Sequence, residues 1–324
     1  MIRLLVVAVL AAVQDKPFDS AFGLAQDKAI ELARGLAQDK PKVEQVGTPR
    51  RFLAADYQKG VLAIFGKDGQ VEWQVKIRDI HDAWVLPDGN VLFQQGWTKV
   101  VEMTPDKKEV WSYDAAKMNG NEGRKVEVHA FQRLADGSTM IAESGPARII
   151  EVDKEGKIRK EIKLKVEKPS VHRDTRNARK LGNGNYLVCH EGDGKVREYD
   201  GEGKVVWEHD AKSQVYGAIR LKNGNTLIAF GGGNRVAEVD PSGKEVWGIG
   251  KTELPGITLA WMTQIERLPN GNTVIVNCHG KPTDPQIIEV TPEKKVVWSY
   301  RDFETLGGAT PVAQTLDDPG NTIR

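Results

Sequence analysis

Three histidines, His81, His129 and His190, stand at positions where a packed β-strand would call for an apolar residue. An imidazole at such a position can transfer a proton near neutral pH, act as a nucleophile or bind a metal ion. Arg176 stands at a related position, and its guanidinium group suits an anionic ligand or a developing negative charge. Any shared chemistry requires a fold that brings these distant residues together.

A short phrase recurs along the chain and predicts the elements that position these residues. In HDAWVLPDGNVLF, from His81 to Phe93, two apolar runs flank Pro-Asp-Gly-Asn. Asp-Gly or Asn-Gly between apolar runs is the strongest short-range signal of a β-hairpin, because both central turn positions need a positive φ. The phrase returns from Leu134, Leu181, Leu221 and Leu268, and imperfectly from Leu316, at spacings of 40 to 48 residues. The chain is therefore a repeat protein.

Each repeat divides into four short β runs, such as HDAWVL, NVLFQQG, KVVEMTP and KEVWSYD. Four strands in a unit of about 46 residues are typical of a propeller blade. The fourth run carries a tryptophan in five repeats, at Trp73, Trp111, Trp207, Trp247 and Trp298, whereas the third repeat has Lys160 there. We interpret these tryptophans as core residues at contacts between sheets.

The two ends of the chain predict how the ring closes. The first repeat, from Arg51, contains only the last three strands of a blade, and the C-terminal ATPVAQTLDD supplies the missing first strand. Pairing of Ala309 to Leu316 with the segment near Phe52 would close six blades without an open edge at the junction. We predict an all-β, six-bladed β-propeller of four-stranded antiparallel blades over residues 48–324, with the first blade closed by both termini.

Hairpin geometry then groups the polar residues. The start of the first strand of an antiparallel hairpin lies beside the end of the second, so we count five residues outward from each turn. This gives His81, His129, Arg176, Tyr216, Thr263 and Pro311 on first strands, and Gln95, Glu143, His190, Phe230 and Asn277 on second strands. The positions predict a ring at one mouth of the channel, which His172 and His279 could join. Our ligand-binding candidates are His81, Gln95, His129, Glu143, Arg176, His190, Tyr216 and Asn277.

Several functions fit such a ring, and binding of a small polar or anionic ligand is the one we predict. Catalysis is an alternative, with His81, His129, His190 and Arg176 as candidates. We expect no cofactor, but a metal-dependent hydrolase or transferase could hold Zn²⁺ or Ca²⁺ through His81, His129, His190 and Glu143. The polar residues could also simply satisfy one another around channel water, or the face could dock a protein partner.

Composition excludes some partners. There are 46 basic and 45 acidic residues and no basic run, so neither nucleic acid nor an anionic membrane is an expected partner. Cys189 and Cys278 fall on inner strands of non-neighbouring repeats, and we expect no disulfide between them.

The N-terminal segment indicates export. Residues 1–13, MIRLLVVAVLAAV, combine one arginine with an apolar run that is too short to span a bilayer, and we interpret them as a secretory signal peptide. Residues 14–47 are rich in helix formers and predict an amphipathic helix followed by a linker. The mature protein is expected in the periplasm or outside the cell, without a membrane span.

The phrases LPNGNTVI, EVTPEKKVVWSY and AEVDPSGKEVW resemble those of the PQQ-like and arylsulfotransferase-like propellers, and the resemblance covers Val46 to the C-terminus. It implies the propeller fold. Arylsulfotransferases of this kind use channel histidines and an arginine, one histidine carrying the sulfuryl group, so an arylsulfotransferase-like reaction at the same ring is the activity that the resemblance implies. No motif assigns that role to a particular histidine here. Quinoprotein dehydrogenases have eight blades and longer chains, so bound PQQ is not expected.

Overall fold

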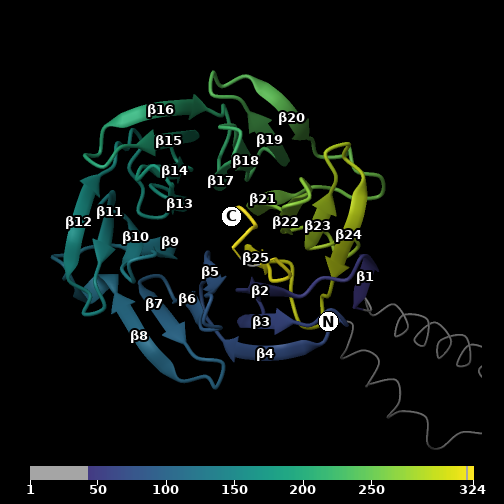
Figure 1. Cartoon of the computed structure of the whole chain (residues 1–324), viewed down its shortest axis with the longest axis horizontal. Coiled ribbons are helices and arrows are strands. Elements are labelled where there is room, and N and C mark those ends of the chain that lie inside the picture. The colour runs from purple at the N-terminus through teal and green to yellow at the C-terminus, as the bar shows by residue number, and fades with distance from the viewer. Residues whose placement is uncertain (1–42, 319) are drawn as a thin grey trace, which may run out of the picture. The chain divides into compact units, whose positions relative to one another are not determined.

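The structure, a computed structural model, describes residues 43–318 and 320–324. Six sheets are arranged as blades around a central axis, as Figure 1 shows. The predicted six-bladed, all-β propeller is therefore confirmed. The predicted signal peptide (residues 1–13) and the predicted helix lie outside the described residues. Within those residues, no helix has the length and apolar character that a bilayer crossing needs.

The strands of each blade run from the axis outward. Blade one contains β25 (Val312–Thr315), β2 (Phe52–Asp56), β3 (Val61–Phe65) and β4 (Val71–Lys76). Blade two contains β5 (Ala83–Val85), β6 (Val91–Gln95), β7 (Lys99–Met103) and β8 (Glu109–Asp114), followed by the short 3₁₀ helix η1 (Ala115–Lys117). Blade three contains β9 (Glu127–Arg133), β10 (Thr139–Ser144), β11 (Arg148–Val152) and β12 (Ile158–Lys163).

Blades four to six follow the same order. Blade four contains β13 (Asn177–Lys180), β14 (Tyr186–His190), β15 (Lys195–Tyr199) and β16 (Val205–Asp210). Blade five contains β17 (Gly217–Arg220), β18 (Thr226–Phe230), β19 (Arg235–Val239) and β20 (Glu245–Ile249). Blade six contains β21 (Trp261–Arg267), β22 (Thr273–Cys278), β23 (Ile287–Val290) and β24 (Val296–Arg301), and β1 (Glu44–Gly47) is added at its outer edge.

The repeated phrase forms the turn between the two innermost strands of a blade. In blade two, the Leu86 backbone amide donates to the Asn90 carbonyl at 2.8 Å, and the Gly89 amide donates to the Leu86 carbonyl at 2.9 Å. Gly89 adopts a φ of 85°, a conformation that costs glycine little free energy because glycine has no Cβ. The phrases from Leu134, Leu181, Leu221 and Leu268 form the same turn. The phrase from Leu316 does not, because its strand β25 pairs with β2 from the other end of the chain, and the Leu316 amide donates to the Arg51 carbonyl instead.

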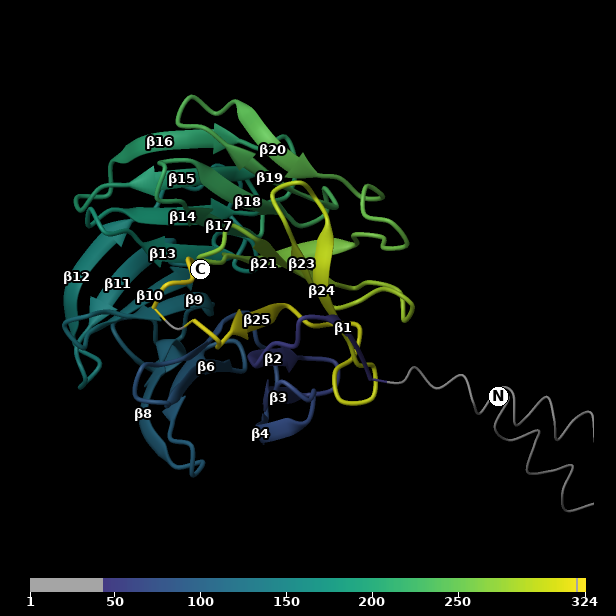
Figure 2. The same cartoon turned by 45° about the vertical axis from the view of Figure 1, so that its right-hand side comes forward.

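Both ends of the chain build blade one, as predicted. Strand β25 pairs with β2 in antiparallel register, with Ala313 opposite Ala54. The two strands lie side by side in both views of the molecule (Figures 1 and 2). Phe52 of β2 stacks on Phe65 at 4.9 Å and meets the ring of Tyr300 of blade six edge-on at 4.7 Å. The closing blade is thus packed against its neighbour as well as hydrogen-bonded.

Strand β1 is a fifth strand of blade six, within the segment 14–47 that was predicted to be a helix followed by a linker. Residues 44–47 pair with β24, and Gly47 lies opposite Trp298. A Cβ at Gly47 would come within 1.9 Å of the Val297 carbonyl oxygen, so only glycine allows this approach. The four residues show no alternating apolar pattern, because three of them are exposed, and this explains why the pattern did not reveal a strand.

The fourth-strand tryptophans join neighbouring blades. Trp73 donates from its indole nitrogen to the Pro105 carbonyl at 3.0 Å, and Trp207 does the same to Pro241 at 2.9 Å. Each acceptor lies in the outer turn of the next blade. The interpretation of all five as core residues needs correction: Trp73 and Trp298 are buried, whereas the other three are partly exposed. An indole needs a hydrogen-bond partner, and the neighbouring turn supplies it at the molecular surface.

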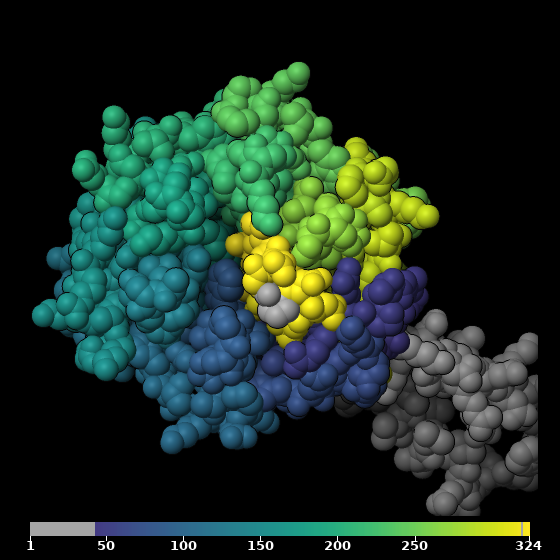
Figure 3. All heavy atoms as spheres, viewed as in Figure 1, coloured from purple at the N-terminus to yellow at the C-terminus, as the bar shows by residue number. Residues whose placement is uncertain are grey.

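A buried polar network fills the channel beside the inner strands. Asp82 accepts from Nη1 of Arg179 at 2.8 Å and from the amide of Gln264 at 2.9 Å. Arg324 donates to the Ala83 carbonyl and to Oε1 of Gln264, both at 2.7 Å. Figure 3 shows the C-terminal segment lying over the centre of this face. The network links blades two, four and six across the axis.

Both cysteines, Cys189 and Cys278, are free and buried.

Candidate functional site

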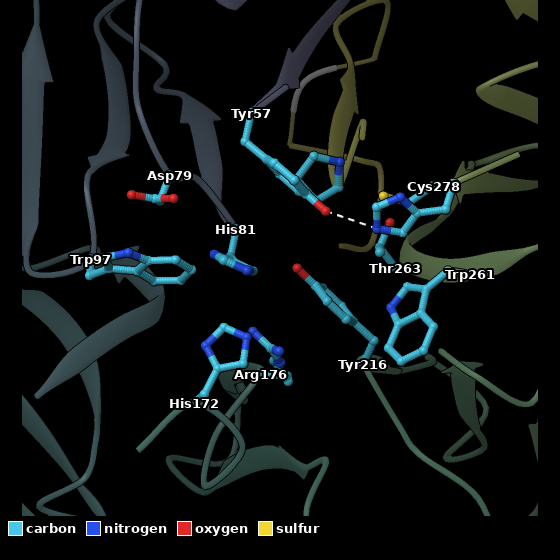
Figure 4. Close-up of a pocket in the computed structure, with 12 residues that line it drawn as sticks. Tyr57, Asp79, His81, Trp97, His172, Arg176, Tyr216, Trp261, Thr263 and Cys278 are labelled. Atoms are coloured by element: carbon cyan, nitrogen blue, oxygen red, sulfur yellow. Dashed lines mark hydrogen bonds between the residues drawn. The ribbon is translucent and has the colours of Figure 1, made fainter. Parts of the chain in front are cut away.

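A cavity of about 410 Å³ opens at the mouth of the channel where the innermost strands begin. Its walls come from five blades, and Figure 4 shows the side chains that line it. The lining consists of Tyr57, Asp79, His81, Trp97, His172, Arg176, Tyr216, Trp261, Thr263, Cys278, His279 and Pro311. The propeller therefore brings His81, Arg176 and Tyr216, three of the eight predicted ligand-binding residues, to one place. His172 and His279, expected as additional members of this face, are there too.

His81 lies near the middle of the cavity (Figure 4). Its backbone amide donates to Oε1 of Gln94 at 2.7 Å, which holds the residue at the entrance to β5. Its ring nitrogen Nδ1 is buried and has no hydrogen-bond partner among the described residues. Burial lowers the pKa of His81 well below the usual value, and the positive character of His129 and Arg176 lowers it further. The imidazole is thus neutral and can accept a hydrogen bond from a molecule in the cavity.

Arg176 and Tyr216 form a second wall. The Arg176 guanidinium group lies over the Tyr216 ring at 5.6 Å, and its Nε donates to the carboxylate of Glu191. Two polar atoms remain buried without a described partner: Nη1 of Arg176 and the hydroxyl of Tyr216. Burial raises the pKa of Tyr216 well above the usual value, so its hydroxyl stays protonated and can donate. Together these side chains offer two hydrogen-bond donors, one of them charged.

Aromatic side chains make the rim. The hydroxyl of Tyr57 lies 2.8 Å from Nε2 of His279, as the dashed line in Figure 4 shows. His279 adopts a φ of 59°, a left-handed conformation directly after β22 that turns the chain back at the mouth. Trp97 and Tyr57 are 37% and 36% exposed, so both rings present apolar surface to water at the mouth of the cavity. Flat, partly exposed rings of this kind suit contact with a ligand.

Beside His81, two histidines share one carboxylate. Oε2 of Glu127 lies 2.9 Å from Nε2 of His129 and 2.8 Å from Nδ1 of His172. Although burial opposes the shift, the two histidine side chains beside it lower the pKa of Glu127 to about 2. Burial lowers the pKa of His129, against the opposite effect of the neighbouring Glu127 carboxylate. His129 is fully buried and does not line the cavity, but its ring centroid lies 4.7 Å from that of His81.

Four other predicted ligand-binding residues do not line the cavity. Glu143 accepts from the Tyr113 hydroxyl at 2.8 Å and from Nε of Arg148 at 2.6 Å. The amide of Asn277 binds backbone groups of the loop between β20 and β21, accepting from the Ala260 amide at 2.7 Å. Gln95 lies at the end of β6 and is partly buried. The fourth residue, His190, is fully buried and does not line the cavity either.

His190 has a partner on each ring nitrogen. Its Nδ1 donates to the Asp174 carbonyl at 2.7 Å, and its Nε2 lies 2.9 Å from the hydroxyl of Tyr199. The predicted metal-binding set of His81, His129, His190 and Glu143 is therefore not brought together, because His190 and Glu143 are each held by other side chains. Among the described residues, the potential metal-binding group is Glu127, His129 and His172.

Two of the lining residues, Tyr57 and Trp97, were not predicted, because counting outward from the hairpins did not extend into the turns between the second and third strands. These turns reach the same mouth and supply Tyr57 after β2, Trp97 after β6 and His279 after β22. The sequence carried a signal for the first two, since ADYQKG and QQGWTK each place an aromatic residue in such a turn. It also carried one for Glu127, because a Glu-Val-His sequence on a strand directs the first and third side chains to one side.

Comparison with known proteins gives a family and a fold. The family model described as Mal s 1 allergenic protein-like matches residues 57–277. A solved structure of a protein of unknown function from Bacteroides caccae aligns with a TM-score of 0.73 and 23% identity, covering 83% of this chain and 100% of that chain. No curated protein matches the chain.

Virginiamycin B lyase from Staphylococcus aureus is also similar. Its selenomethionine-substituted form aligns with a TM-score of 0.54 and 13% identity, covering 79% of this chain and 87% of that chain. A catalytically inactive variant of it with quinupristin aligns with a TM-score of 0.55 and 12% identity, covering 80% and 88%. At such identities these likenesses establish the fold alone.

Proposed function

The chain belongs to the Mal s 1 allergenic protein-like family. For this member of the family, we propose that the histidine-lined cavity binds a small polar or anionic molecule. One observation carries the proposal. Nδ1 of His81, Nη1 of Arg176 and the hydroxyl of Tyr216 are buried polar atoms without a described protein partner, and their residues line one cavity. Leaving such an atom unsatisfied costs about 1–3 kcal/mol, so three of them on three blades favour a molecule that binds all three.

The charge of the donors supports an anionic group. A guanidinium group and a phenol donate, and the neutral His81 can accept from a protonated ligand atom. Asp79 is the one acidic residue among the lining side chains described, and it lies with Trp97 at the edge. The rings of Tyr57, Trp97 and Trp261 supply flat apolar walls. A small aromatic or planar body that carries one anionic group therefore matches the cavity best.

A calorimetric comparison tests this. Benzenesulfonate is the anionic probe, and benzenesulfonamide, of nearly the same shape, is the neutral one. We expect benzenesulfonate to bind with one site and more tightly than benzenesulfonamide. Arg176→Gln should weaken its binding by about 10- to 100-fold, since a hydrogen bond to a charged group is worth about 1.5–3 kcal/mol. Tyr216→Phe should weaken it several-fold, by the loss of a neutral hydrogen bond of about 1 kcal/mol.

Arg235→Gln provides the matched control. It makes the same change of charge on β19, where Arg235 pairs with the exposed Glu245 and does not line the cavity, and it should leave binding unchanged. Equal affinity for the two probes, or equal effects of the Arg176→Gln and Arg235→Gln substitutions, would contradict the proposal.

A reaction at the same site is the second candidate. The neutral, buried His81 with an unpartnered Nδ1, beside the Tyr216 hydroxyl, favours it, because such an imidazole can serve as a general base. Incubation with 4-nitrophenyl sulfate and a phenol acceptor tests for group transfer. Product release that His81→Ala abolishes would establish an enzyme, and its absence together with saturable benzenesulfonate binding would establish a binding protein.

Export is part of the proposal. The apolar run with a single arginine at residues 1–13 supports a cleaved signal peptide, which would place the cavity in the periplasm or outside the cell. Expression of the full chain, followed by N-terminal sequencing of the secreted product, tests this. A product retained in the cell with residues 1–13 intact would contradict it.

A further inference from the structure

We infer that Glu127, His129 and His172 form a binding site for a divalent transition-metal ion, with Zn²⁺ as the first choice. Each residue offers one ligand atom, and these three atoms lie within 4.8 Å of one another. The set differs from the one that the sequence suggested, and shares only His129 with it. Two imidazoles and one glutamate are the protein ligands of a common class of zinc sites that keep a fourth position open.

The backbone directs two of the ligands to one side. Glu127 and His129 both belong to β9, and the register shifts there: Ala130 pairs with Ala142, whereas Val128 pairs with Glu143. His129 is therefore the extra residue of a β-bulge. Bulges of this kind re-aim side chains and are frequent beside functional sites. The third ligand, His172, comes from the loop that enters blade four, so the site joins two neighbouring blades.

The hydrogen bonds of His129 fit a metal ligand. Its Nδ1 lies 2.7 Å from the carbonyl oxygen of Thr175, which can only accept. Nδ1 is thus the N–H nitrogen, and the other nitrogen, Nε2, is the atom directed at Glu127. A ligating histidine typically donates its second nitrogen to a carbonyl or carboxylate in this way, which fixes the ring and leaves one nitrogen for the metal.

Binding of the ion requires the three ligand atoms to adjust. Atoms that bind one tetrahedral zinc ion at about 2.0–2.1 Å lie roughly 3.3–3.4 Å apart. The distances from Oε2 of Glu127 to the two histidine nitrogens are 2.9 and 2.8 Å and must lengthen by a few tenths of an ångström, and the two nitrogens, which lie within 4.8 Å of each other, must reach the same separation. His172 can move, since its side chain is 44% exposed. His172 and His81 both line the cavity, so the open position of the metal would face it.

Metal titration of the full chain tests the inference. After treatment with a chelator, the protein is titrated with Zn²⁺ by calorimetry, and Co²⁺ is added to a second sample to record its visible absorption. We expect one equivalent of Zn²⁺ and a Co²⁺ spectrum of a four- or five-coordinate site. His172→Ala and Glu127→Gln should each weaken Zn²⁺ binding by more than about tenfold, because even the loss of an outer partner costs that much.

Two matched controls accompany these variants. Glu122→Gln changes an exposed carboxylate of the same interblade segment, and His209→Gln changes a histidine on the outer strand β16. Both should bind Zn²⁺ as the unsubstituted chain does. Substoichiometric binding, or affinity that falls equally in the controls, would overturn the inference. The titration contains no organic anion, so its failure would leave the proposed cavity ligand standing, and the failure of benzenesulfonate to bind would leave the metal site standing.

Discussion

Asp82 and Arg179 form a two-pronged ion pair across the channel, with Nη1 of Arg179 2.8 Å from Oδ2 and Nη2 3.2 Å from Oδ1 of Asp82. The two residues are 97 positions apart in the chain and belong to blades two and four. Both are buried, and Arg179 also lies over the ring of Trp84, 4.6 Å from its centroid. The pair therefore joins the inner strands of blades two and four, which are not neighbours in the ring.

Removal of one partner should therefore destabilise the whole propeller. Asp82→Ala leaves Arg179 buried without its counter-charge, and we expect the free energy of unfolding to fall by about 3–5 kcal/mol. Urea denaturation followed by tryptophan fluorescence measures this. The double variant Asp82→Leu with Arg179→Met removes both charges and should recover much of the loss. A loss below about 1 kcal/mol for Asp82→Ala would contradict a structural role for the pair.

Two of the outer-strand tryptophans should differ in their contribution to stability. Trp298 is fully buried and Trp207 is partly exposed. Trp298→Ala should cost roughly 3–5 kcal/mol, and Trp207→Ala clearly less. Trp207→Phe keeps most of the apolar surface but loses the hydrogen bond to Pro241, a change worth about 1 kcal/mol. Equal losses for the two alanine variants in thermal or urea unfolding would show that burial does not set their contributions.

Stability should fall on acidification, in part through His190. Burial lowers the pKa of His190 to about 4 from an ordinary value of 6.5. Between these values the unfolded chain binds a proton that the folded chain does not, so stability decreases as the pH falls from 6.5 to about 4 and this contribution is then exhausted. The shift corresponds to an upper limit of roughly 3 kcal/mol.

His190→Gln isolates this contribution. The variant should be less stable at pH 7, because the hydrogen bond with Tyr199 changes, and the difference from the unsubstituted chain should shrink toward pH 4. Tyr199→Phe removes the hydroxyl but keeps the titrating ring, so it should retain the pH dependence. Unfolding free energies at pH 7, 5.5 and 4 measure this. Parallel curves for His190→Gln and the unsubstituted chain would refute the assignment.

Arg324 should matter for stability although it is the last of the described residues. Its guanidinium group is buried against Gln264, the Ala83 carbonyl and Glu266, which lies 3.2 Å from its Nε. Arg324→Ala would leave the buried Glu266 without that charge, and burial already raises the pKa of Glu266. We expect a loss of about 3 kcal/mol or more in urea unfolding, and a smaller one for Arg324→Lys, which retains the charge. Unchanged stability of Arg324→Ala would mean that the network holds without it.

The fold followed from local signals. Turn phrases such as Leu86 to Asn90 need glycine for their positive φ, so they mark each hairpin in the sequence itself. The closure of blade one followed by counting strands, because only a first strand was missing. Strand β1 escaped because its contacts are mostly backbone hydrogen bonds at an exposed edge, which impose no apolar pattern.

The site was only partly predictable because the pairing register between the two innermost strands is irregular in blades three and six. Counting outward from the turn placed Glu143 opposite His129, but the bulge in β9 sets Glu143 opposite Val128 instead. A second irregularity in β21 sets Asn277 opposite Met262 and not Thr263. A count of residues cannot detect an extra residue in one strand. His81, Arg176 and Tyr216, in contrast, stand just before their strands, and the count located them.

The position of Arg324 also connects the closing strand to the candidate site. Arg324 donates to the Ala83 carbonyl at 2.7 Å and to the Ala313 carbonyl at 3.3 Å, and Ala83 follows His81 by two residues. Displacement of this one side chain would therefore loosen β5 and β25 together, and with them the backbone that carries the His81 imidazole.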